Sequence, residues 1–335
     1  MKALVSVPRG TVFDTFFTSE NIRLAEELGE IVWNDSTEQM TEAELAARIG
    51  DCDTYVSLWK SPALTKAVLD HAPNLKLLIH LGSTVVPFVS DAMWERGIRV
   101  ISGFDYYAES TAEGALAYIL AAQRRIPFYS ERACRNGIWK QSGDYTDGLL
   151  RKTVGIVGYG GVGRYVARML SAFRVRIKVF DIREIPTEEK KAYGLEQCGI
   201  EELFSTCDII SLHLAYNAST HHLINDRLLS LIKPNALLVN TARGGILDQA
   251  ALTKHLIQRD FRAALDVLEK EPADPNDPLL RLENVLITPH QAGVTTNLRA
   301  VLTADLLREG AEFLDRGIPL RNEISPDYAK SMSQS

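Results

Sequence analysis

Three short segments carry side chains whose types and spacing could do chemistry. They carry Arg243, the pair Asp266 and Glu271, and His290, each at or just after the end of a predicted strand. The spacing is 28 residues from Arg243 to Glu271 and 19 from there to His290. A planar guanidinium can hold an anionic oxygen, and a histidine can give or take a proton near neutral pH. Each residue alone could be a loop cation or the end of an element, but the joint spacing favours a catalytic set.

These segments end strands of a regular alternating series. The predicted strands are Thr153–Val157, Ile177–Phe180, Asp208–Leu212, Ala236–Asn240, Arg262–Asp266 and Val285–Thr288. Strands separated by helical patterns indicate a parallel sheet, and six strands match a complete doubly wound nucleotide-binding sheet. Ligands bind beyond the carboxyl ends of such strands, so the arginine, the carboxylates and the histidine should converge there.

A glycine motif follows the first strand of this series, Gly158-Tyr159-Gly160-Gly161-Val162-Gly163. Its first glycine permits a tight turn, the second lets the backbone approach a pyrophosphate, and the last lets helix and strand pack closely. The start of the next helix then presents free N–H groups to the phosphates. Arg164-Tyr165 follows where a phosphate loop would have lysine and serine or threonine, so a dinucleotide is the better prediction.

Asp181 lies 23 residues beyond Gly158, at the end of a predicted strand. Its carboxylate could accept hydrogen bonds from the ribose hydroxyls of adenosine and would repel a 2′-phosphate. Arg183 could partly compensate that repulsion. The sequence therefore favours NAD over NADP, while a solvated strand-end aspartate is the alternative.

The pattern of the first hundred residues predicts a second α/β domain, in which helices cover a sheet. Strands are expected at Ala3–Val7, Glu30–Trp33, Thr54–Leu58, Leu75–Ile79 and Arg99–Ile101, with helices at Asn21–Leu28, Glu42–Ile49, Pro62–His71 and Val89–Glu95. This alternation is typical of right-handed βαβ units around a parallel sheet.

Two long helices follow the two series of strands, one after each series. One is expected over Thr111–Gln123, with a capping box at Ser110-Thr111-Ala112-Glu113 and an end at Arg124–Pro127. The other, Thr296–Leu314, should return to pack on the first domain, and the polar tail Ser325–Ser335 should fray. The predicted domains are thus 1–105 with 296–335, and 106–295.

Composition limits the class of protein. The length of 335 residues indicates two domains. A content of 46% hydrophobic and 24% charged residues is typical of a globular protein. A net charge of −6 argues against a nucleic-acid partner, and no apolar run approaches the roughly 20 residues of a membrane span. The four cysteines lack C-x-x-C spacing, so we expect a cytoplasmic protein without a metal site.

Together these segments resemble the D-isomer-specific 2-hydroxyacid dehydrogenase family, whose members interconvert 2-keto acids and D-2-hydroxy acids with NAD(H) or NADP(H). The resemblance extends over roughly Leu75 to Gly293 and is most specific in Thr241–Asp248, Ala264–Pro272 and Thr288–Gly293. It implies α/β architecture with two doubly wound parallel-sheet domains, a Rossmann-type NAD domain and a flavodoxin-like substrate domain, and a cleft between them.

The resemblance also assigns roles. It makes Arg243, Glu271 and His290 the catalytic residues, brings Asp266 to the nicotinamide carboxamide, and puts Thr241 and Ala242 at the cofactor. Hydride arriving at a 2-keto acid places negative charge on the carbonyl oxygen, so a fixed cation and a proton donor are required. Arg243 would polarise the substrate and His290 would supply the proton, with Glu271 favouring the imidazolium and orienting the ring.

The sequence departs from the family in its substrate loop. The stretch Gly82-Ser83-Thr84 replaces a Gly-x-Gly-x-Asp-Asn type loop, although the backbone N–H groups of Ser83 and Thr84 could still hold a carboxylate. The segment Phe104–Tyr107 is aromatic where the family is usually smaller and more polar. Both differences leave the substrate's side chain open.

The sequence therefore predicts an NAD-dependent D-2-hydroxyacid dehydrogenase, similar to glyoxylate or hydroxypyruvate reductases, that acts on a small-molecule 2-keto or 2-hydroxy acid. The alternative is a non-catalytic, dinucleotide-sensing corepressor-like interaction protein on the same fold. A homodimer is expected because side chains between the long helix and the glycine motif need cover, unless they fold back on their own subunit. They are Tyr118–Leu120, Ile126, Phe128, Tyr129, Ile138 and Trp139.

Overall fold

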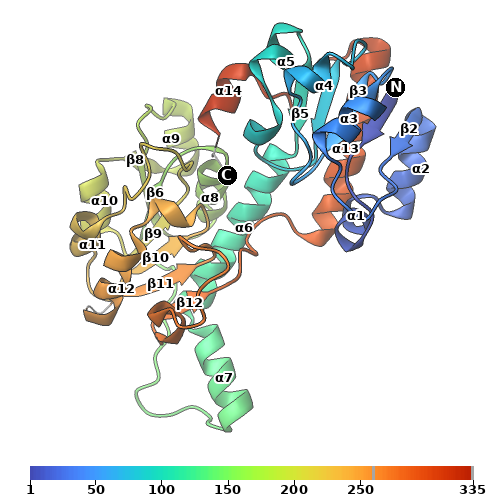
Figure 1. Cartoon of the computed structure of the whole chain (residues 1–335). Coiled ribbons are helices and arrows are strands. Elements are labelled where there is room, and N and C mark those ends of the chain that lie inside the picture. Colours follow the sequence, from blue (N-terminus) through green and yellow to red (C-terminus); the bar gives the residue numbers. More distant parts are fainter. Residues whose placement is uncertain (259–260, 333–335) are drawn as a thin grey trace. The chain divides into compact units, whose positions relative to one another are not determined.

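The chain divides into two compact units, Met1–Tyr107 with Val294–Ser335, and Ala108–Gly293. The structure, a computed structural model, describes residues 1–258 and 261–332 (Figure 1). Each unit is built on one parallel sheet. No helix of the described residues is long and apolar enough to cross a membrane.

The first unit contains a five-stranded sheet in the order β2-β1-β3-β4-β5. Its strands are β1 (Lys2–Val5), β2 (Glu30–Trp33), β3 (Thr54–Ser57), β4 (Leu77–His80) and β5 (Arg99–Ser102). Its helices are α1 (Thr11–Phe16), α2 (Ser19–Leu28), α3 (Glu42–Ile49), α4 (Lys66–Leu69), α5 (Asp91–Glu95), α13 (Thr296–Arg316) and α14 (Pro326–Ser331), and η1 (Val86–Phe88) is a 3₁₀ turn. This strand order is the flavodoxin-like one.

Alternation along the strands gives this sheet two buried faces. Leu78 packs with side chains of α3, α4 and α5 on one face, whereas Leu77 and Ile79 pack with side chains of α1 and α13 on the other. The long C-terminal helix therefore completes the core of the first unit, as the sequence predicted. Both faces of the five-stranded sheet are covered, as is usual for parallel sheets.

The second unit contains a seven-stranded parallel sheet in the order β12-β11-β10-β9-β6-β7-β8. Its strands are β6 (Thr153–Val157), β7 (Arg176–Phe180), β8 (Leu195–Gln197), β9 (Ile209–Leu212), β10 (Leu237–Asn240), β11 (Arg262–Leu265) and β12 (Val285–Ile287). Its helices are α7 (Ile126–Asn136), α8 (Gly161–Leu170), α9 (Thr187–Tyr193), α10 (Ile200–Thr206), α11 (Asp226–Leu231) and α12 (Gln249–Gln258), with 3₁₀ turns η2 (Gly244–Ile246) and η3 (Pro278–Arg281).

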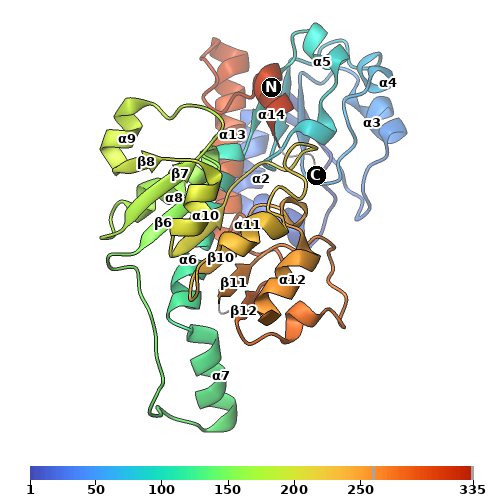
Figure 2. The same ribbon diagram turned by 90° about the vertical axis from the view of Figure 1, so that its left-hand side faces the viewer.

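The six strands that come first along the chain, β6–β11, have the doubly wound order. From β6 the chain builds the sheet outward in one direction to β8, and then returns to add β9 on the other side of β6. Helices α6 (Phe104–Gln123) and α8 contribute to the core on one face, and α10, α11 and α12 contribute to the core on the other (Figure 2). The predicted α/β fold with two parallel sheets is confirmed. The count of six strands is wrong, because the three-residue edge strand β8 is too short to show a pattern in the sequence.

The long helix begins seven residues earlier than predicted. Helix α6 starts at Phe104, whose backbone N–H donates to Ser102 Oγ, so the capping box proposed at Ser110 is wrong. Ser110 lies inside the helix, and its hydroxyl donates to the carbonyl oxygen of Gly293. The helix ends at Gln123 as expected, but a further helix, α7, starts at Ile126 with Pro127 in its first turn, where proline is tolerated.

Two other segments differ from the sequence prediction. Only Lys66–Leu69 of the expected helix Pro62–His71 is helical, because Thr65 caps the N-terminus by accepting from the N–H of Val68. The expectation that Ser325–Ser335 frays is wrong for residues 325–332, because Pro326–Ser331 form α14, Ser325 and Met332 cap its ends, and Ala329 and Met332 are buried. Residues 333–335 lie outside the described part of the chain.

Candidate active site

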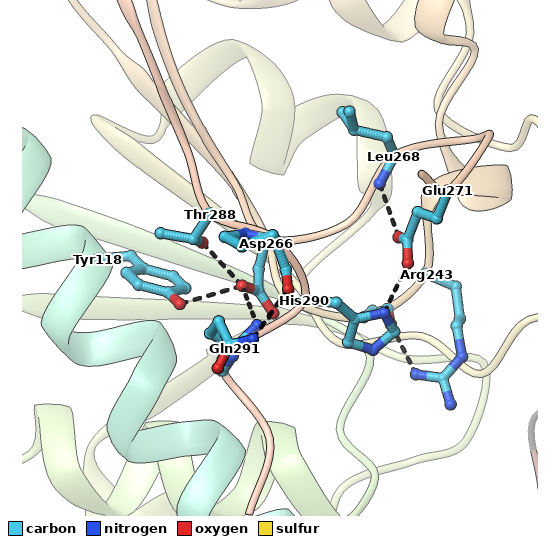
Figure 3. Close-up of polar contacts among 11 residues, drawn as sticks. Tyr118, Arg243, Asp266, Leu268, Glu271, Thr288, His290 and Gln291 are labelled. Atoms are coloured by element: carbon cyan, nitrogen blue, oxygen red, sulfur yellow. Dashed lines mark hydrogen bonds and ion pairs between the residues drawn. The ribbon is translucent and has the colours of Figure 1, made fainter. Parts of the chain in front are cut away.

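The predicted catalytic residues follow three neighbouring strands of the second unit. Asn240 of β10 pairs in register with Leu265 of β11, which pairs with Ile287 of β12, so the three strands end together. The loops after them carry Arg243, Glu271 and His290. The structure thus brings the three residues to one edge of the sheet, as Figure 3 shows.

His290 and Glu271 form a direct pair. Nδ1 of His290 lies 2.8 Å from Oε2 of Glu271, and the other carboxylate oxygen, Oε1, accepts from the backbone N–H of Leu268 at 3.0 Å. Because an ionised carboxylate only accepts, Nδ1 carries the hydrogen and Nε2 is the nitrogen at which a proton can be exchanged. The His290 side chain is 49% exposed, so a ligand can reach it.

The backbone of His290 is also held in an uncommon conformation. Its φ of 55° is left-handed, a region that costs a non-glycine residue roughly 1–2 kcal/mol. Its N–H donates to the carbonyl oxygens of Asp266 and Thr288, at 2.8 and 3.0 Å. Hydrogen bonds to a buried strand end therefore aim the imidazole.

Asp266 anchors the loop that bears His290. Its buried carboxylate accepts from four donors, which are Tyr118 Oη at 3.0 Å, Thr288 Oγ1 at 2.7 Å, and the backbone N–H groups of Gln291 and Ala292 at 2.7 and 2.8 Å. Three of these bonds end on Oδ1 and one on Oδ2 (Figure 3). The resemblance pointed to this aspartate, but nothing in the sequence marked Tyr118 as its partner.

Arg243 lies half-buried beside this pair. Its Nη1 donates to the carbonyl oxygen of Ala242 at 2.8 Å. Burial lowers the pKa of the guanidinium below its usual range, and the negative charge of Glu271 opposes that shift. Arginine nevertheless stays protonated, so the site combines a fixed cation with a histidine acid–base group.

The glycine motif fits a pyrophosphate. Gly158 has a left-handed φ of 97°, and a Cβ on Gly163 would lie 2.1 Å from the carbonyl oxygen of Gly158, so both positions require glycine. A Cβ on Gly160 would meet no protein atom within 4 Å, which leaves the space that a phosphate needs. Gly161 and Val162 begin α8, whose first N–H groups have no partner within the helix.

Asp181 contacts the same turn. Its Oδ2 accepts from the N–H of Tyr159 at 2.7 Å, and its Oδ1 accepts from the N–H of Arg183 at 2.9 Å. Burial raises the pKa of this carboxyl, but these backbone hydrogen bonds outweigh it and keep the pKa below its usual value. Asp181 is therefore a half-buried, ionised strand-end carboxylate that also shapes the glycine turn.

Two polar atoms at the carboxyl edge lack a protein partner. Within the described residues, no hydrogen bond reaches the buried hydroxyl of Thr241 or Nδ1 of His213, and these residues follow the neighbouring strands β10 and β9. Nε2 of His213 lies 2.8 Å from Ser211 Oγ, and burial lowers the pKa of the ring to about 3, so the ring is neutral. Unpaired buried polar groups are costly, which fits a bound ligand at Thr241.

The substrate loop predicted after β4 lies in the first unit. The carbonyl oxygens of Gly82 and Ser83 accept from Gly103 N and Ser102 Oγ, at 3.0 and 3.3 Å, so β5 supports this loop. A cavity of about 540 Å³ also lies in this unit, lined by Tyr106, Asp305, Arg321 and Tyr328 among others. Its lining contains none of the predicted site residues.

A doubly wound sheet with a glycine turn before a helix, and a histidine–carboxylate pair beside an arginine at its carboxyl edge, define a dinucleotide-dependent oxidoreductase. The chain belongs to the D-isomer specific 2-hydroxyacid dehydrogenase family, because the model of that family's NAD binding domain matches residues 116–292. It is accordingly an NAD(P)-dependent enzyme that acts on CH–OH groups. The predicted family and the prediction of an enzyme are confirmed.

Similar proteins support this assignment. The chain is 33% identical over 305 residues to the glyoxylate reductase of Korarchaeum cryptofilum, covering 89% of this chain and 90% of that protein. It is 36% identical over 276 residues to the D-3-phosphoglycerate dehydrogenase of Methanocaldococcus jannaschii, covering 82% of this chain and about half, 51%, of that longer protein. The solved structure of an acyclic imino acid reductase with NADPH and D-Arg superposes with a TM-score of 0.77 at 28% identity, covering 97% and 100% of the two chains.

The anchoring role of Asp266 can be tested by Asp266→Asn. The amide keeps the shape but puts an N–H₂ group against donors, so the free energy of unfolding should fall by about 1–3 kcal/mol. Denaturant unfolding measures this loss. Asp274→Asn is the matched control, since Asp274 is exposed and accepts one backbone hydrogen bond. An equally stable Asp266→Asn protein would contradict the anchoring role.

Proposed function

We propose that the protein transfers a hydride between NAD(H) and C2 of a small 2-keto or D-2-hydroxy acid. The observation that carries this proposal is the His290–Glu271 pair at 2.8 Å beside Arg243, in a chain of this family. We assign residues 108–293 to cofactor binding and the first unit to substrate binding, close to the domain limits expected from the sequence.

The cofactor would be held by residues along the carboxyl edge of the second sheet. Gly158–Gly163 would bind the pyrophosphate, Asp181 the adenosine ribose, and Thr241 with Ala242 the nicotinamide end. Asp266 Oδ2 accepts one hydrogen bond from the described chain, so it keeps capacity for the carboxamide. When bound, the cofactor supplies or accepts the hydride.

Arg243 would hold the substrate's carboxylate and carbonyl oxygens through its planar fork, which a lysine cannot reproduce. Its charge stabilises the negative charge that develops on the carbonyl oxygen as the hydride arrives. We further propose that backbone N–H groups of Gly82, Ser83 and Thr84 bind the substrate's carboxylate.

His290 would complete the reduction by protonating the new alkoxide from Nε2. Glu271 holds Nδ1–H and so keeps Nε2 as the exchanging nitrogen while balancing the imidazolium charge. In the oxidative direction the same nitrogen accepts the hydroxyl proton. Glu271 acts through His290 and is a positioning residue.

We propose a substrate similar to glyoxylate or hydroxypyruvate. The support is the name of the Korarchaeum cryptofilum glyoxylate reductase, which matches this chain over about nine-tenths of both lengths. The phosphoglycerate dehydrogenases matched here are about twice as long as the shared part, so their names carry less weight.

We also propose a cytoplasmic location. All four cysteines, Cys52, Cys134, Cys198 and Cys207, are free thiols. Free thiols are typical of proteins in a reducing compartment.

The assignment of His290 predicts that His290→Asn binds NADH almost normally but loses about 10²–10⁴-fold in kcat, since general acid–base groups contribute that much. NADH binding is followed by fluorescence and kcat by NADH absorbance with the best 2-keto acid. His222→Asn is a matched control, because His222 forms a similar pair with Glu269 at 2.8 Å. Comparable turnover in His290→Asn and the parent would refute the assignment.

The cofactor preference is tested by Asp181→Ala. Removal of this carboxylate takes away an acceptor for the ribose hydroxyls and the charge that repels a 2′-phosphate. The ratio of kcat/KM for NADH to that for NADPH should therefore fall. An unchanged ratio would mean that Asp181 only shapes the glycine turn, and Arg183→Ala, which removes the neighbouring cation, should shift the ratio in the opposite direction.

We propose that the enzyme is a homodimer formed through the segment 126–150. Helix α7 buries none of its residues and projects from its unit, and Trp139 is 82% exposed (Figures 1 and 2). Folding back on its own unit therefore does not cover this surface. The earlier part of the predicted surface, Tyr118–Leu120, is wrong, because Ile119 is buried in the core and Tyr118 binds Asp266.

Light scattering at micromolar concentration should give twice the 37.2 kDa of one chain. Trp139→Glu should shift the mass toward one chain, because it places a charge in the apolar contact. Ile257→Glu, at an exposed apolar position on α12, should leave the mass unchanged. A parent protein with the mass of one chain, with or without NAD, would refute the dimer.

A further inference from the structure

We propose that Tyr107 and Arg299 of the first unit, beside Trp59, bind an oxygen-bearing group at the far end of the substrate, the end opposite its 1-carboxylate. The enzyme would then prefer 2-keto acids with a hydroxyl or carboxylate at that end over those with an alkyl group. This inference rests on the proposed function and extends it to the substrate's side chain.

The first observation is a pair of unsatisfied buried donors. Within the described residues, neither the hydroxyl of Tyr107 nor Nε of Arg299 has a hydrogen-bond partner, although both atoms are buried. Both side chains contact Trp59, whose ring centroid lies 6.4 Å from that of Tyr107 and 5.4 Å from the guanidinium carbon of Arg299. Two neighbouring buried donors without partners destabilise the folded protein unless a ligand or a water molecule accepts their hydrogen bonds.

The second observation is the setting of Arg299. Its guanidinium lies over the rings of Phe16 and Trp59, 5.5 and 5.4 Å from their centroids, and its Nη1 donates to Thr15 Oγ1 at 3.3 Å. No carboxylate of residues 1–258 or 261–332 forms an ion pair with Arg299. The cation is thus fixed in place without a counter-charge, and Trp59 is 40% exposed, which leaves this group accessible.

The third observation places this group beside the predicted substrate loop. Trp59 follows β3, and the loop that starts at Gly82 follows the neighbouring strand β4, whose His80 is in register with Ser57. A Cβ on Gly103 would lie 3.3 Å both from the carbonyl oxygen of Gly82 and from Cε2 of Tyr107. The ring of Tyr107 is therefore separated from the loop by a single glycine.

The ring of Tyr107 also meets Trp59 edge to face, with centroids 6.4 Å apart. Pairwise contacts thus link Trp59, Tyr107 and Arg299 to the loop that follows β4. A 2-keto acid whose carboxylate is bound at Gly82–Thr84 would extend its far end along these side chains.

The chemistry of the group selects the ligand. Tyr107 Oη–H and Arg299 Nε–H are both donors, and one of them is cationic, so they fit an acceptor oxygen. An alkyl end would leave both donors buried and unpaired, and sites built to hydrogen-bond a substrate strongly reject analogues that lack the polar group. Both a hydroxyl and a carboxylate offer such an acceptor oxygen, and the experiment distinguishes between these two groups.

The test compares 2-keto acids of matched shape. Hydroxypyruvate and 2-oxobutyrate differ by a hydroxyl in place of a methyl group, and oxaloacetate and 4-methyl-2-oxopentanoate differ by a carboxylate in place of an isopropyl group. The oxygen-bearing acid of at least one pair should have a kcat/KM about tenfold or more higher, the value of one hydrogen bond to a charged group. The pair with the larger ratio identifies the hydroxyl or the carboxylate.

Tyr107→Phe and Arg299→Met should bring that ratio toward one while leaving NADH binding, followed by fluorescence, unchanged. Arg308→Met is the matched control, since Arg308 lies on the same helix, is exposed and pairs with Asp305. Equal kcat/KM values within both pairs, or a preference that survives both variants, would overturn the inference.

A second measurement separates this inference from the proposed function. If no 2-keto acid is turned over, the proposed function fails, and thermal stabilisation by the same acids in the presence of NAD⁺ then decides the inference alone. Selective stabilisation by the oxygen-bearing acids, lost in Tyr107→Phe, would support it. Equal shifts within each pair would overturn it, leaving water as the partner of the two donors.

Discussion

The buried carboxylate of Asp266 is the constraint on which the active site depends. It accepts from two side-chain hydroxyls and two backbone N–H groups, and the carbonyl oxygen of the same residue accepts from His290 N. The loop after β12 is thereby tied to the end of β11. Without these bonds, the left-handed backbone of His290 would lose its main anchor to the sheet, and only Thr288 and Glu271 would still hold the residue.

Parallel pairing supplies the rest of the arrangement. Strands β10, β11 and β12 end in register, so residues separated by 28 and 19 positions in the sequence emerge at one edge. Arg243 brings a cation, Glu271 orients the imidazole through Nδ1, and a glycine turn at the end of β6 adds space for a pyrophosphate. The second unit therefore carries the proposed catalytic and cofactor-binding residues at the end of one sheet, which suits chemistry that requires fixed donors.

The two units differ in how closely they follow the family. The second unit keeps the glycine turn, the arginine, the carboxylates and the histidine of the motif. The first unit has Ser83-Thr84 in its predicted substrate loop and the aromatic segment Phe104–Tyr107 at the start of α6. This contrast agrees with the proposal that the first unit binds the substrate, because hydride and proton transfer make the same demands for every 2-keto acid, whereas the substrate's side chain varies.

The sequence by itself determined the two parallel sheets, the glycine turn and the three loops with Arg243, Glu271 and His290, because strand periodicity, glycine spacing and strand ends are local properties. It did not determine the start of α6. The capping-box pattern at Ser110 predicted a start there, but the helix continues back to Phe104. The sequence did not reveal edge strand β8 or helix α14, because short elements gain their stability from packing against distant parts of the chain, as the burial of Ala329 in α14 illustrates. Only the tertiary structure decided that Tyr118 binds Asp266 and that Trp59 meets Tyr107 and Arg299. These contacts join residues 148, 48 and 240 positions apart, and no local pattern encodes them.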